Sequence, residues 1–192
     1  MKKAKFVLLA TLAILMLFGT GSLAAAAAQP GGSPELPSGV QAYLKLEGVC
    51  GESKASKFAD WIELSGVEFA TKTTTISFGG GGGTSKSALD HFTITKTYDC
   101  SSIPLFLDSV SGKHIKDGQI VFAKASDGRP VTVLEIDLSD IVVSEVQFDD
   151  LNERIALQPG KIEFRYIPQD AKGAAGPPVQ GGWDFAKNSA AK

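Results

Sequence analysis

The residue types that most often carry out chemistry are scarce in this chain, which has two cysteines, Cys50 and Cys100, and two histidines, His91 and His114. A catalytic cysteine needs a neighbouring base or a second cysteine that lowers the pKa of its thiol, and neither cysteine has one close by in the sequence. Neither histidine belongs to a nucleophile motif such as G-x-S-x-G. We therefore expect a protein that is not an enzyme and that needs no metal and no cofactor.

Acidic residues gather in one short run that contains Asp149, Asp150 and Glu153. Two neighbouring carboxylates are the groups that glycoside hydrolysis and Ca²⁺ binding use. The run D-D-L-N-E lacks the regular ligand spacing of a calcium loop, and we interpret it as a solvated turn. A secreted hydrolase that uses Asp149, Asp150 or a histidine is kept as a third hypothesis.

Five consecutive glycines precede Thr84-Ser85-Lys86-Ser87 and look at first like a phosphate-binding loop. The phosphate-loop pattern requires glycine immediately before the lysine, where this chain has Ser85, and it requires a helix after the loop. The segment that follows here alternates like a strand. We therefore predict a flexible loop between strands at residues 79–83, which a partner could order, because long glycine runs lose much entropy on ordering.

The first 28 residues have the three parts of a secretory signal peptide. Lys2, Lys3 and Lys5 form a positive start, residues 6–18 are an apolar run, and residues 24–28 are small. The apolar run is shorter than the roughly 20 residues of a membrane-spanning helix. We expect cleavage near Ala28, a flexible linker at 29–40 and a folded domain at 41–188. The mature protein would be periplasmic, at the cell surface or extracellular, without a stable membrane anchor.

Chain length and net charge limit the number of domains and the kinds of partner. A chain of 192 residues with 43% hydrophobic residues fits one globular domain. The formal net charge is −2, and without Lys2, Lys3 and Lys5 it becomes −5. A nucleic-acid-binding protein normally carries a basic face, so we expect no nucleic acid among the partners.

The two cysteines each follow the end of a predicted strand. An exported protein enters an oxidising compartment, in which a disulfide persists. Closing a loop of about 50 residues stabilises a fold by roughly 4 kcal/mol on the chain-entropy model. We expect a disulfide between Cys50 and Cys100, with two separate buried thiols as the alternative.

Alternation with a period of two residues dominates the mature chain and predicts strands that bury one face. In the segment 161–167, Lys161, Glu163 and Arg165 share the polar face. In the segment 90–98 the apolar face holds Phe92, Ile94 and Tyr98, and the polar face holds His91, Thr93, Thr95 and Thr97. Further strands are predicted at 42–49, 61–69 with a bulge at Gly66, 72–78, 119–124 and 131–148, the last bending or splitting near Ser139–Asp140.

One segment predicts a helix instead of a strand. Residues 101–111 offer Ser102 as N-cap and Gly112 as the C-terminal stop, with Leu105, Phe106 and Val110 on one buried side. An Asp-Gly pair at 127–128 predicts a hairpin turn. About seven strands and one helix favour a mainly β fold, a closed or nearly closed β-barrel or a sandwich. Trp183 and Phe185 predict a late segment that packs onto this body.

Several phrases of the sequence together resemble a known family. They are G-V-C-G-E-S at 48–53, a glycine-rich loop before L-D-H-F-T-I-T-K-T-Y-D at 89–99, a helix that runs into S-G-K-H at 111–114, and G-P-P-V and G-W-D at 176–179 and 182–184. Their order and spacing resemble the Hcp family, the haemolysin-coregulated proteins of type VI secretion. The resemblance covers residues 42–188 approximately.

The resemblance implies a fold and an assembly. The fold is a small β-barrel of two sheets with one short flanking helix. Six copies form a ring with an open centre, and the rings stack into the tube of a contractile injection machine whose lumen carries small effector proteins. Such tubes assemble in the cytoplasm, whereas the signal peptide of this chain predicts export. An exported carrier on the same fold is therefore included in this hypothesis.

The resemblance also suggests which residues meet other subunits. Two loops would project toward the next ring, and two polar strand faces are candidates for the lumen or for the contact between subunits. The alternative hypothesis is a monomeric secreted β-barrel that recognises a protein or glycan through its loops. The candidate residues for ring stacking are Gly51, Glu52, Ser53, Gly79, Gly80, Gly81, Gly82 and Gly83, and those for the faces are Thr93, Thr95, Thr97, Lys161, Glu163 and Arg165.

Overall fold

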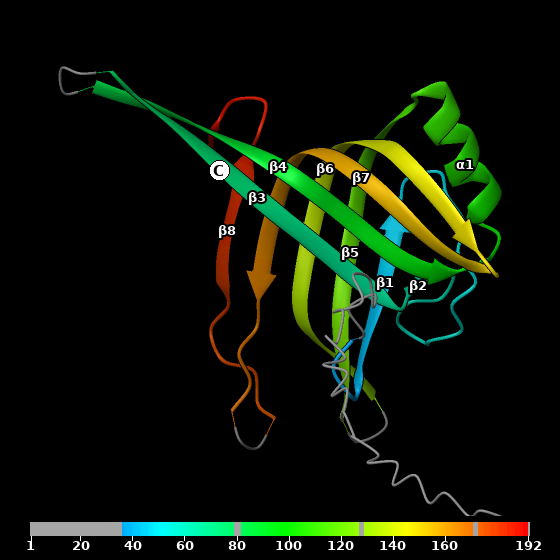
Figure 1. Cartoon of the computed structure of the whole chain (residues 1–192). Helices are drawn as coiled ribbons and strands as arrows, with labels where there is room; N and C mark the ends of the chain where they lie inside the picture. The colour runs from blue at the N-terminus through cyan, green and yellow to red at the C-terminus, as the bar shows by residue number, and fades with distance from the viewer. Residues whose placement is uncertain (1–35, 79–81, 127–128, 171–172, 192) are drawn as a thin grey trace, which may run out of the picture. The chain divides into compact units, whose positions relative to one another are not determined.

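The computed structural model describes residues 36–78, 82–126, 129–170 and 173–191, which form a mainly β fold with one short helix (Figure 1). This confirms the expected fold class. In chain order the elements are β1 (Val40–Leu46), β2 (Ile62–Leu64), β3 (Gly66–Phe78), β4 (Gly82–Thr97), α1 (Ser102–Ser111), β5 (His114–Ser126), β6 (Arg129–Asp149), β7 (Asn152–Tyr166), β8 (Val179–Asp184) and β9 (Ser189–Ala190).

The strands form one curved antiparallel sheet in the order β2-β1-β5-β6-β7-β4-β3, and β8 and β9 extend it beside β7. The ends of this path, β2 and β3, are joined through Ser65 alone. The Ser65 N–H donates to the carbonyl oxygen of Thr95 in β4, at 2.8 Å. The sheet is therefore a nearly closed barrel: its two sides are parts of one continuous sheet that is not closed by a strand ladder.

The core lies between the two sides of this curved sheet. Period-two alternation places one face of each strand inside, because consecutive side chains of a strand point to opposite faces. Phe92 and Ile94 of β4 and Ile155 and Leu157 of β7 are fully buried there. The same cluster contains Ala42, Leu44, Leu46, Val49, Ile62, Leu64, Leu105, Ile115, Ile120, Ile136, Leu138, Ile141, Val143 and Ile162.

The predicted bend near Ser139–Asp140 is a phase change inside one continuous strand. In β6, Asp140 has a positive φ of 54°. Ser139 pairs with Lys161 and Ile141 pairs with Pro159, so Asp140 and Gly160 fall between two ladder pairs. Core residues occupy even positions up to 138 and odd positions at 141 and 143. The irregularity lets a strand of 21 residues keep its apolar side chains inside while the sheet curves.

The strand predicted at 61–69 divides into β2 and the start of β3, which continues through the strand predicted at 72–78. At Gly66 the chain changes from one strand to the next, so the bulge predicted there is wrong. The register of the β3–β4 ladder shifts between Ala70 and Thr71 instead. The alternation breaks phase at Gly66, but a bulge and a change of strand interrupt the pattern in the same way, so the sequence did not distinguish them.

The helix α1 ends at Gly112, whose φ of 66° is the left-handed conformation expected of a C-terminal glycine. Ser101, and not the predicted Ser102, is the N-cap. The predicted buried side is wrong for two of its three residues, since Leu105 is buried whereas Phe106 and Val110 are 53% and 67% exposed. The helix packs on β6 through the face that carries Ser102, Leu105 and Asp108.

Candidate functional site

The most prominent feature of the structure is an arm, which we define as residues 71–78 of β3 and 82–90 of β4. These two segments pair with each other from Thr71–Leu89 to Phe78–Gly82. β4 pairs with β7 only from Thr93 to Thr97, so among the described residues no strand flanks the arm on either side. Figure 1 shows the arm extending past β8, away from the curved sheet.

The arm contains the glycine run in which five stacking residues were predicted. Gly82 and Gly83 belong to β4 and pair with Phe78 and Ser77, whereas Gly79, Gly80 and Gly81 lie outside the described residues. Residues 71–74, Lys86 and Ala88 are exposed. The arm contacts the body through Asn188, whose Oδ1 accepts the Ser87 N–H at 3.0 Å. The glycine run therefore connects two strands at the far end of a ribbon, and no helix follows it.

The other predicted stacking residues lie in the connection between β1 and β2. Gly51 is buried, and a Cβ atom added to it would lie 2.1 Å from the carbonyl carbon of Trp61, so no larger residue fits. Its N–H donates to Asp60 O, and the Ser53 N–H donates to Trp61 O. Phe58 of this connection stacks on Tyr43 of β1 with ring centroids 4.4 Å apart. The connection is thus fastened to the sheet, with Glu52 exposed on its outer side.

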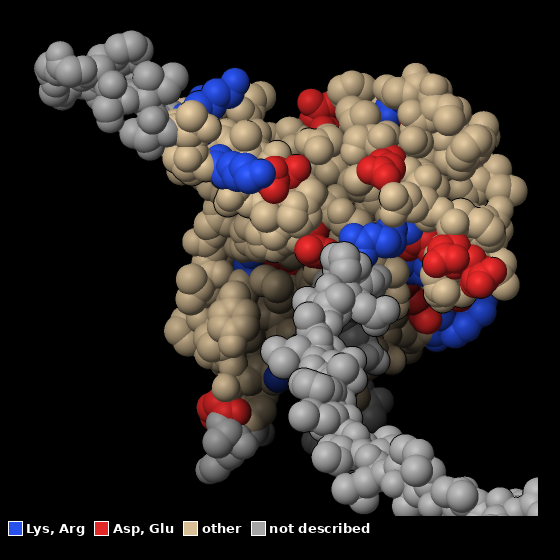
Figure 2. All heavy atoms as spheres, viewed as in Figure 1, with Lys and Arg blue, Asp and Glu red and all other residues tan. Residues whose placement is uncertain are grey.

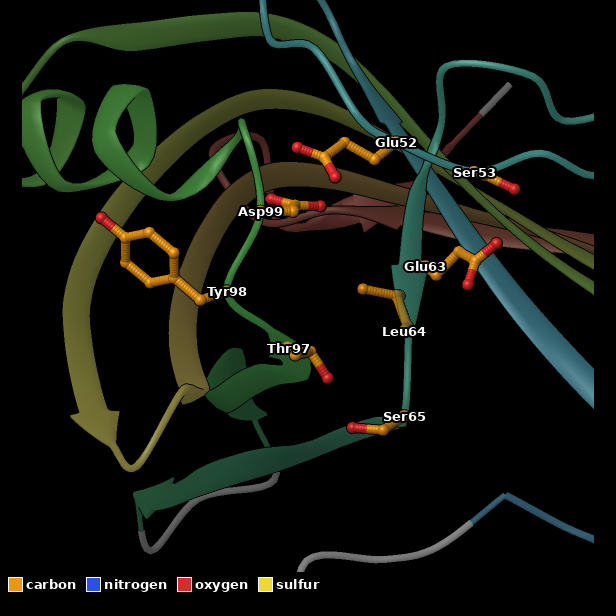
Figure 3. A pocket seen from close by; sticks show the side chains of 8 residues that line it. All are labelled: Glu52, Ser53, Glu63, Leu64, Ser65, Thr97, Tyr98 and Asp99. Carbon is orange, nitrogen blue, oxygen red and sulfur yellow. The ribbon is translucent and has the colours of Figure 1, made fainter.

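A pocket of about 390 Å³ separates this connection from the end of β4 (Figure 3). In the close-up, Glu52 and Asp99 approach each other from opposite walls, and Ser53 and Glu63 point away. The Glu52 Oε1 accepts the backbone N–H of Cys100 at 3.0 Å. The pocket is lined by eight residues, Glu52, Ser53, Glu63, Leu64, Ser65, Thr97, Tyr98 and Asp99.

Cys50 lies in the connection between β1 and β2, and Cys100 lies between β4 and α1. Both are free thiols in the structure. Cys50 is exposed and Cys100 is partly buried. Burial raises the pKa of the Cys100 thiol to about 11, and contact with the Cys50 thiol is the next cause. The nearby carboxylates of Asp99 and Glu52 raise it further. The two thiols are therefore neighbours, although 49 residues of sequence separate them.

Lys161, Glu163 and Arg165 lie on the outer face of β7, as the alternation predicted. Each faces a polar partner on β6, respectively Ser139, Asp137 and Glu135. Arg165 Nη1 donates to Glu135 Oε2 at 2.9 Å, and a hydrogen bond to Glu163 raises the pKa of Lys161. We call these five charged residues, Glu135, Asp137, Lys161, Glu163 and Arg165, the β7 polar face.

Thr93, Thr95 and Thr97 lie on the outer face of β4 in the other side of the sheet. Thr93 and Thr95 are paired with Ala156 and Arg154 of β7. We call the surface of Thr93, Thr95, Thr97, Glu145, Gln147 and Arg154 the threonine face. It is different in composition from the β7 polar face, because hydroxyl and amide groups outnumber charges.

Figure 2 shows acidic and basic side chains interspersed over the visible side of the molecule, with no single basic field.

Sequence analysis missed a buried charged network around Lys96. The Lys96 side chain is fully buried in line with Phe92 and Ile94. Its Nζ donates to Glu153 Oε2 at 2.7 Å, to Asp99 Oδ1 at 2.9 Å and to Ser102 Oγ at 2.9 Å. All three ammonium donors are satisfied. The one signal in the sequence is its phase, since Lys96 follows Phe92 and Ile94 on the same side of the predicted strand and precedes Tyr98.

The same network corrects the interpretation of the acidic run. Asp149 and Asp150 are exposed at the turn between β6 and β7, as a solvated turn requires. Glu153 is 2% exposed and accepts hydrogen bonds from Lys96 and from the Ser102 hydroxyl. It therefore joins β7 to β4 and α1 and does not belong to a solvated group. Its side chain faces the core because Glu153 shares the alternating phase of the buried Ile155 and Leu157.

The histidines lie apart from each other and from the network. His91 is within 3.5 Å of Glu68 and Asp90 on the surface, and His114 Nδ1 is 2.7 Å from Asp140 Oδ1. In the described part of the chain, no group of three or more His, Cys, Asp or Glu side chains is arranged to hold a metal ion. No helix among the described residues is long and apolar enough to cross a membrane.

Comparison with known proteins assigns this architecture to one family. The model of a family described as "Type VI secretion system effector, Hcp" matches residues 43–166. The protein hcp1 of Pseudomonas aeruginosa is 31% identical over 157 residues, which are 78% of this chain and 97% of that protein.

Solved structures agree with the sequence comparison. A structure described as a type six secretion system protein superposes with a TM-score of 0.69 at 26% identity, over 79% of this chain and 99% of its own. Hcp1 from Salmonella typhimurium has the same fold, with a TM-score of 0.65 at 24% identity over 80% and 99% of the two chains.

Proposed function

This chain belongs to the Hcp family of type VI secretion, and on that premise we propose that six copies form a ring and that rings stack into a tube. The arm is the single observation that carries this proposal. A two-stranded ribbon without further strands or a covering helix is marginally stable in water. An arm of this length is therefore expected to gain its stability from a neighbouring subunit.

Two dissimilar polar faces support ring closure. A closed ring is built from heterologous contacts, in which a patch on one subunit meets a different patch on the next. The β7 polar face lies at one end of the β6–β7 ladder and the threonine face at the other, and the two faces differ in charge. We assign the contact between subunits to the β7 polar face, because it carries the denser set of charges, including the cross-strand ion pair of Arg165 with Glu135. We assign the lumen wall to the threonine face.

We assign the contact between stacked rings to the arm and to the connection that carries Gly51, Glu52 and Ser53. The connection is fastened to the sheet through Gly51 and Ser53, so Glu52 presents its carboxylate from a rigid base. The arm carries the glycine run at its far end. Rings stacked in this way would enclose a continuous lumen in which small effector proteins travel.

We propose further that residues 1–28 act as a signal peptide, that residues 29–40 form a linker, and that residues 41–188 are the secreted domain. The charge order and the short apolar run support this division. Mass spectrometry of the secreted protein tests it, with a mature N-terminus near Gln29 as the expected result. Recovery of the intact N-terminus from the medium would contradict the use of the signal and would favour export through a type VI machine.

The test of the ring is the native mass of the protein by light scattering, together with electron microscopy. The chain is expected at six times its single-chain mass, with stacked rings at high concentration. In a shortened variant, Asn-Gly replaces residues 73–87 and joins Lys72 to Ala88, which face each other in the ladder. We expect this variant to fold but to lose stacking or ring formation.

The matched control keeps the arm and exchanges the facing pair Thr73 and Ser87, as Thr73→Ser with Ser87→Thr. It should assemble like the parent chain. A monomer over a wide concentration range for the parent chain would overturn the ring and favour a secreted binding module. Unchanged assembly of the shortened variant would remove the arm from the contact.

Cysteine labelling separates the two faces. Starting from a chain with both native cysteines changed to serine, Thr95→Cys and Glu163→Cys place one thiol on each face. In assembled protein we expect a small maleimide to reach position 95 and to leave position 163 unlabelled. The reverse pattern would exchange the assignments of lumen and subunit contact.

A further inference from the structure

We propose that Cys50 and Cys100 are a covalent modification site, at which an oxidant of the disulfide class closes one intramolecular disulfide that ties the β1–β2 connection to the β4–α1 junction. The inference concerns each single chain and does not rest on ring assembly. A monomer would form the same bond.

The two cysteines belong to separate segments that already touch. Glu52 lies two residues after Cys50, and its Oε1 accepts the backbone N–H of Cys100 at 3.0 Å. A hydrogen bond with the Cys50 side chain is among the causes that raise the pKa of the Cys100 thiol. Glu52 and Asp99 also form opposite walls of the pocket in Figure 3. The contact is therefore made by backbone and side chain together.

Each cysteine lies in a segment that hydrogen bonds and packing hold in place. On one side, Gly51 lies against the backbone of Trp61 and Ile62, with its N–H bonded to Asp60 O. On the other side, Asp99 accepts from Lys96 and from the Ser101 N–H, and the Asp99 N–H donates to Ser102 Oγ. Both segments are held in place beside each other by these hydrogen bonds, so we expect the intramolecular step to have a high effective concentration.

The reaction can begin with an oxidant in solvent, at the exposed Cys50. Cys50 is exposed, so its thiolate can attack a small disulfide such as oxidised glutathione. This forms a mixed disulfide on Cys50 and releases one glutathione thiolate. The Cys100 thiolate then attacks the Cys50 sulfur and releases the second glutathione. Two S–H bonds are lost, one S–S bond forms, and the two electrons reduce oxidised glutathione to two thiols.

The consequence for the molecule is a covalent fastening of the β1–β2 connection. This connection contributes Phe58 to a small cluster with Tyr43, Val121 and Ala123 of the sheet. Without the bond, it is held by hydrogen bonds and by this small cluster. With the bond, opening of the connection requires the β4–α1 junction to open as well. We expect local opening to become about tenfold rarer or more.

The experiment uses the full chain, purified under reductant and then exposed to oxidised glutathione at a fixed ratio to reduced glutathione. Alkylation and peptide mass spectrometry should find one peptide pair that joins Cys50 to Cys100, without intermolecular pairs. Hydrogen exchange should show greater protection of residues 51–61 in the oxidised chain. Its urea midpoint should exceed that of the reduced chain.

Variants separate the steps. In Cys100→Ser, the reaction should stop as a glutathione adduct on Cys50, because the resolving thiol is absent. Cys50→Ser should react much more slowly, since its one thiol is partly buried. Glu52→Gln keeps the acceptor for the Cys100 N–H and removes a negative charge beside that thiol, so closure should be faster than in the parent chain.

The proposal is overturned if the parent chain accumulates a stable adduct on Cys50, or if the sulfurs pair between chains. It is also overturned if both cysteines remain free at a glutathione ratio that oxidises ordinary structural pairs. Loss of the ring in light scattering, with the bond still formed, would count against the proposed function alone. The two proposals can therefore fail separately.

Discussion

The two halves of strand β4 show what holds this protein together. From Phe92 to Lys96 every second side chain is fully buried, and β4 has β3 on one side and β7 on the other. From Gly82 to Asp90 the same strand pairs with β3 alone, and its described side chains are exposed or half-buried. Body and arm thus share their backbone pairing and differ in burial. The comparison indicates that the ladder alone does not account for stability, and that the arm needs a partner that the body does not.

The largest expected effect comes from the buried network of the body. Lys96→Ala leaves Glu153 buried without its cation, which typically costs about 3–5 kcal/mol of unfolding free energy. We expect the urea midpoint to fall accordingly, with assembly lost because the body itself is destabilised. Equilibrium denaturation followed by circular dichroism measures it.

The matched control for Lys96 is Lys116→Ala, which removes a lysine that is 81% exposed and ion-paired with Asp117, itself 58% exposed. We expect a change of about 1 kcal/mol or less, because exposed pairs are screened by solvent. A double variant, Lys96→Met with Glu153→Leu, should recover much of the loss, since both charges are then removed. Equal losses in Lys96→Ala and Lys116→Ala would contradict the role of the network.

The second effect in size separates the two sides of α1. Leu105 is fully buried against the sheet, so Leu105→Ala should cost about 2–4 kcal/mol. Leu107 is 54% exposed, so Leu107→Ala should change stability by about 0.5 kcal/mol or less. Thermal denaturation of the two variants compares them directly. Similar losses would mean that the outer side of the helix is covered in the assembled protein.

The smallest effect belongs to the arm, where Lys72 Nζ lies 2.6 Å from Asp90 Oδ1. The hydrogen bond from Lys72 lowers the pKa of Asp90. A lowered carboxyl pKa adds stability above the ordinary value of 3.8, and this stability is lost as the pH falls through the lowered value. In Lys72→Ala, the Asp90 pKa measured by NMR should rise toward 3.8, with little change in melting temperature at pH 7.

A larger destabilisation at pH 7 from Lys72→Ala than from Leu105→Ala would reverse the order of body and arm. It would mean that the ribbon carries folding energy of its own. An unchanged Asp90 pKa would show that the lysine does not hold the carboxylate in solution.

Local patterns predicted much of the fold because they report on geometry that repeats over short distances. Alternation found the buried face of β7, and Gly112 marked the end of α1, since a left-handed residue there favours glycine. The face of Lys161, Glu163 and Arg165 was also correctly identified as outward. The prediction that Phe106 and Val110 of α1 are buried was wrong, because an apolar residue on a helix does not show whether the sheet packs against it.

The sequence by itself determined the strands, the helix and the phrases that place the chain in its family, since each depends on residues near one another in the chain. Only the tertiary structure decided that Lys96 is buried, because its partner Glu153 comes from a strand 57 residues later. It also decided that two cysteines separated by 49 residues are neighbours, and that half of β4 lies outside the body. These outcomes follow from which strands pair, and pairing over such separations is set by the packing of the whole sheet.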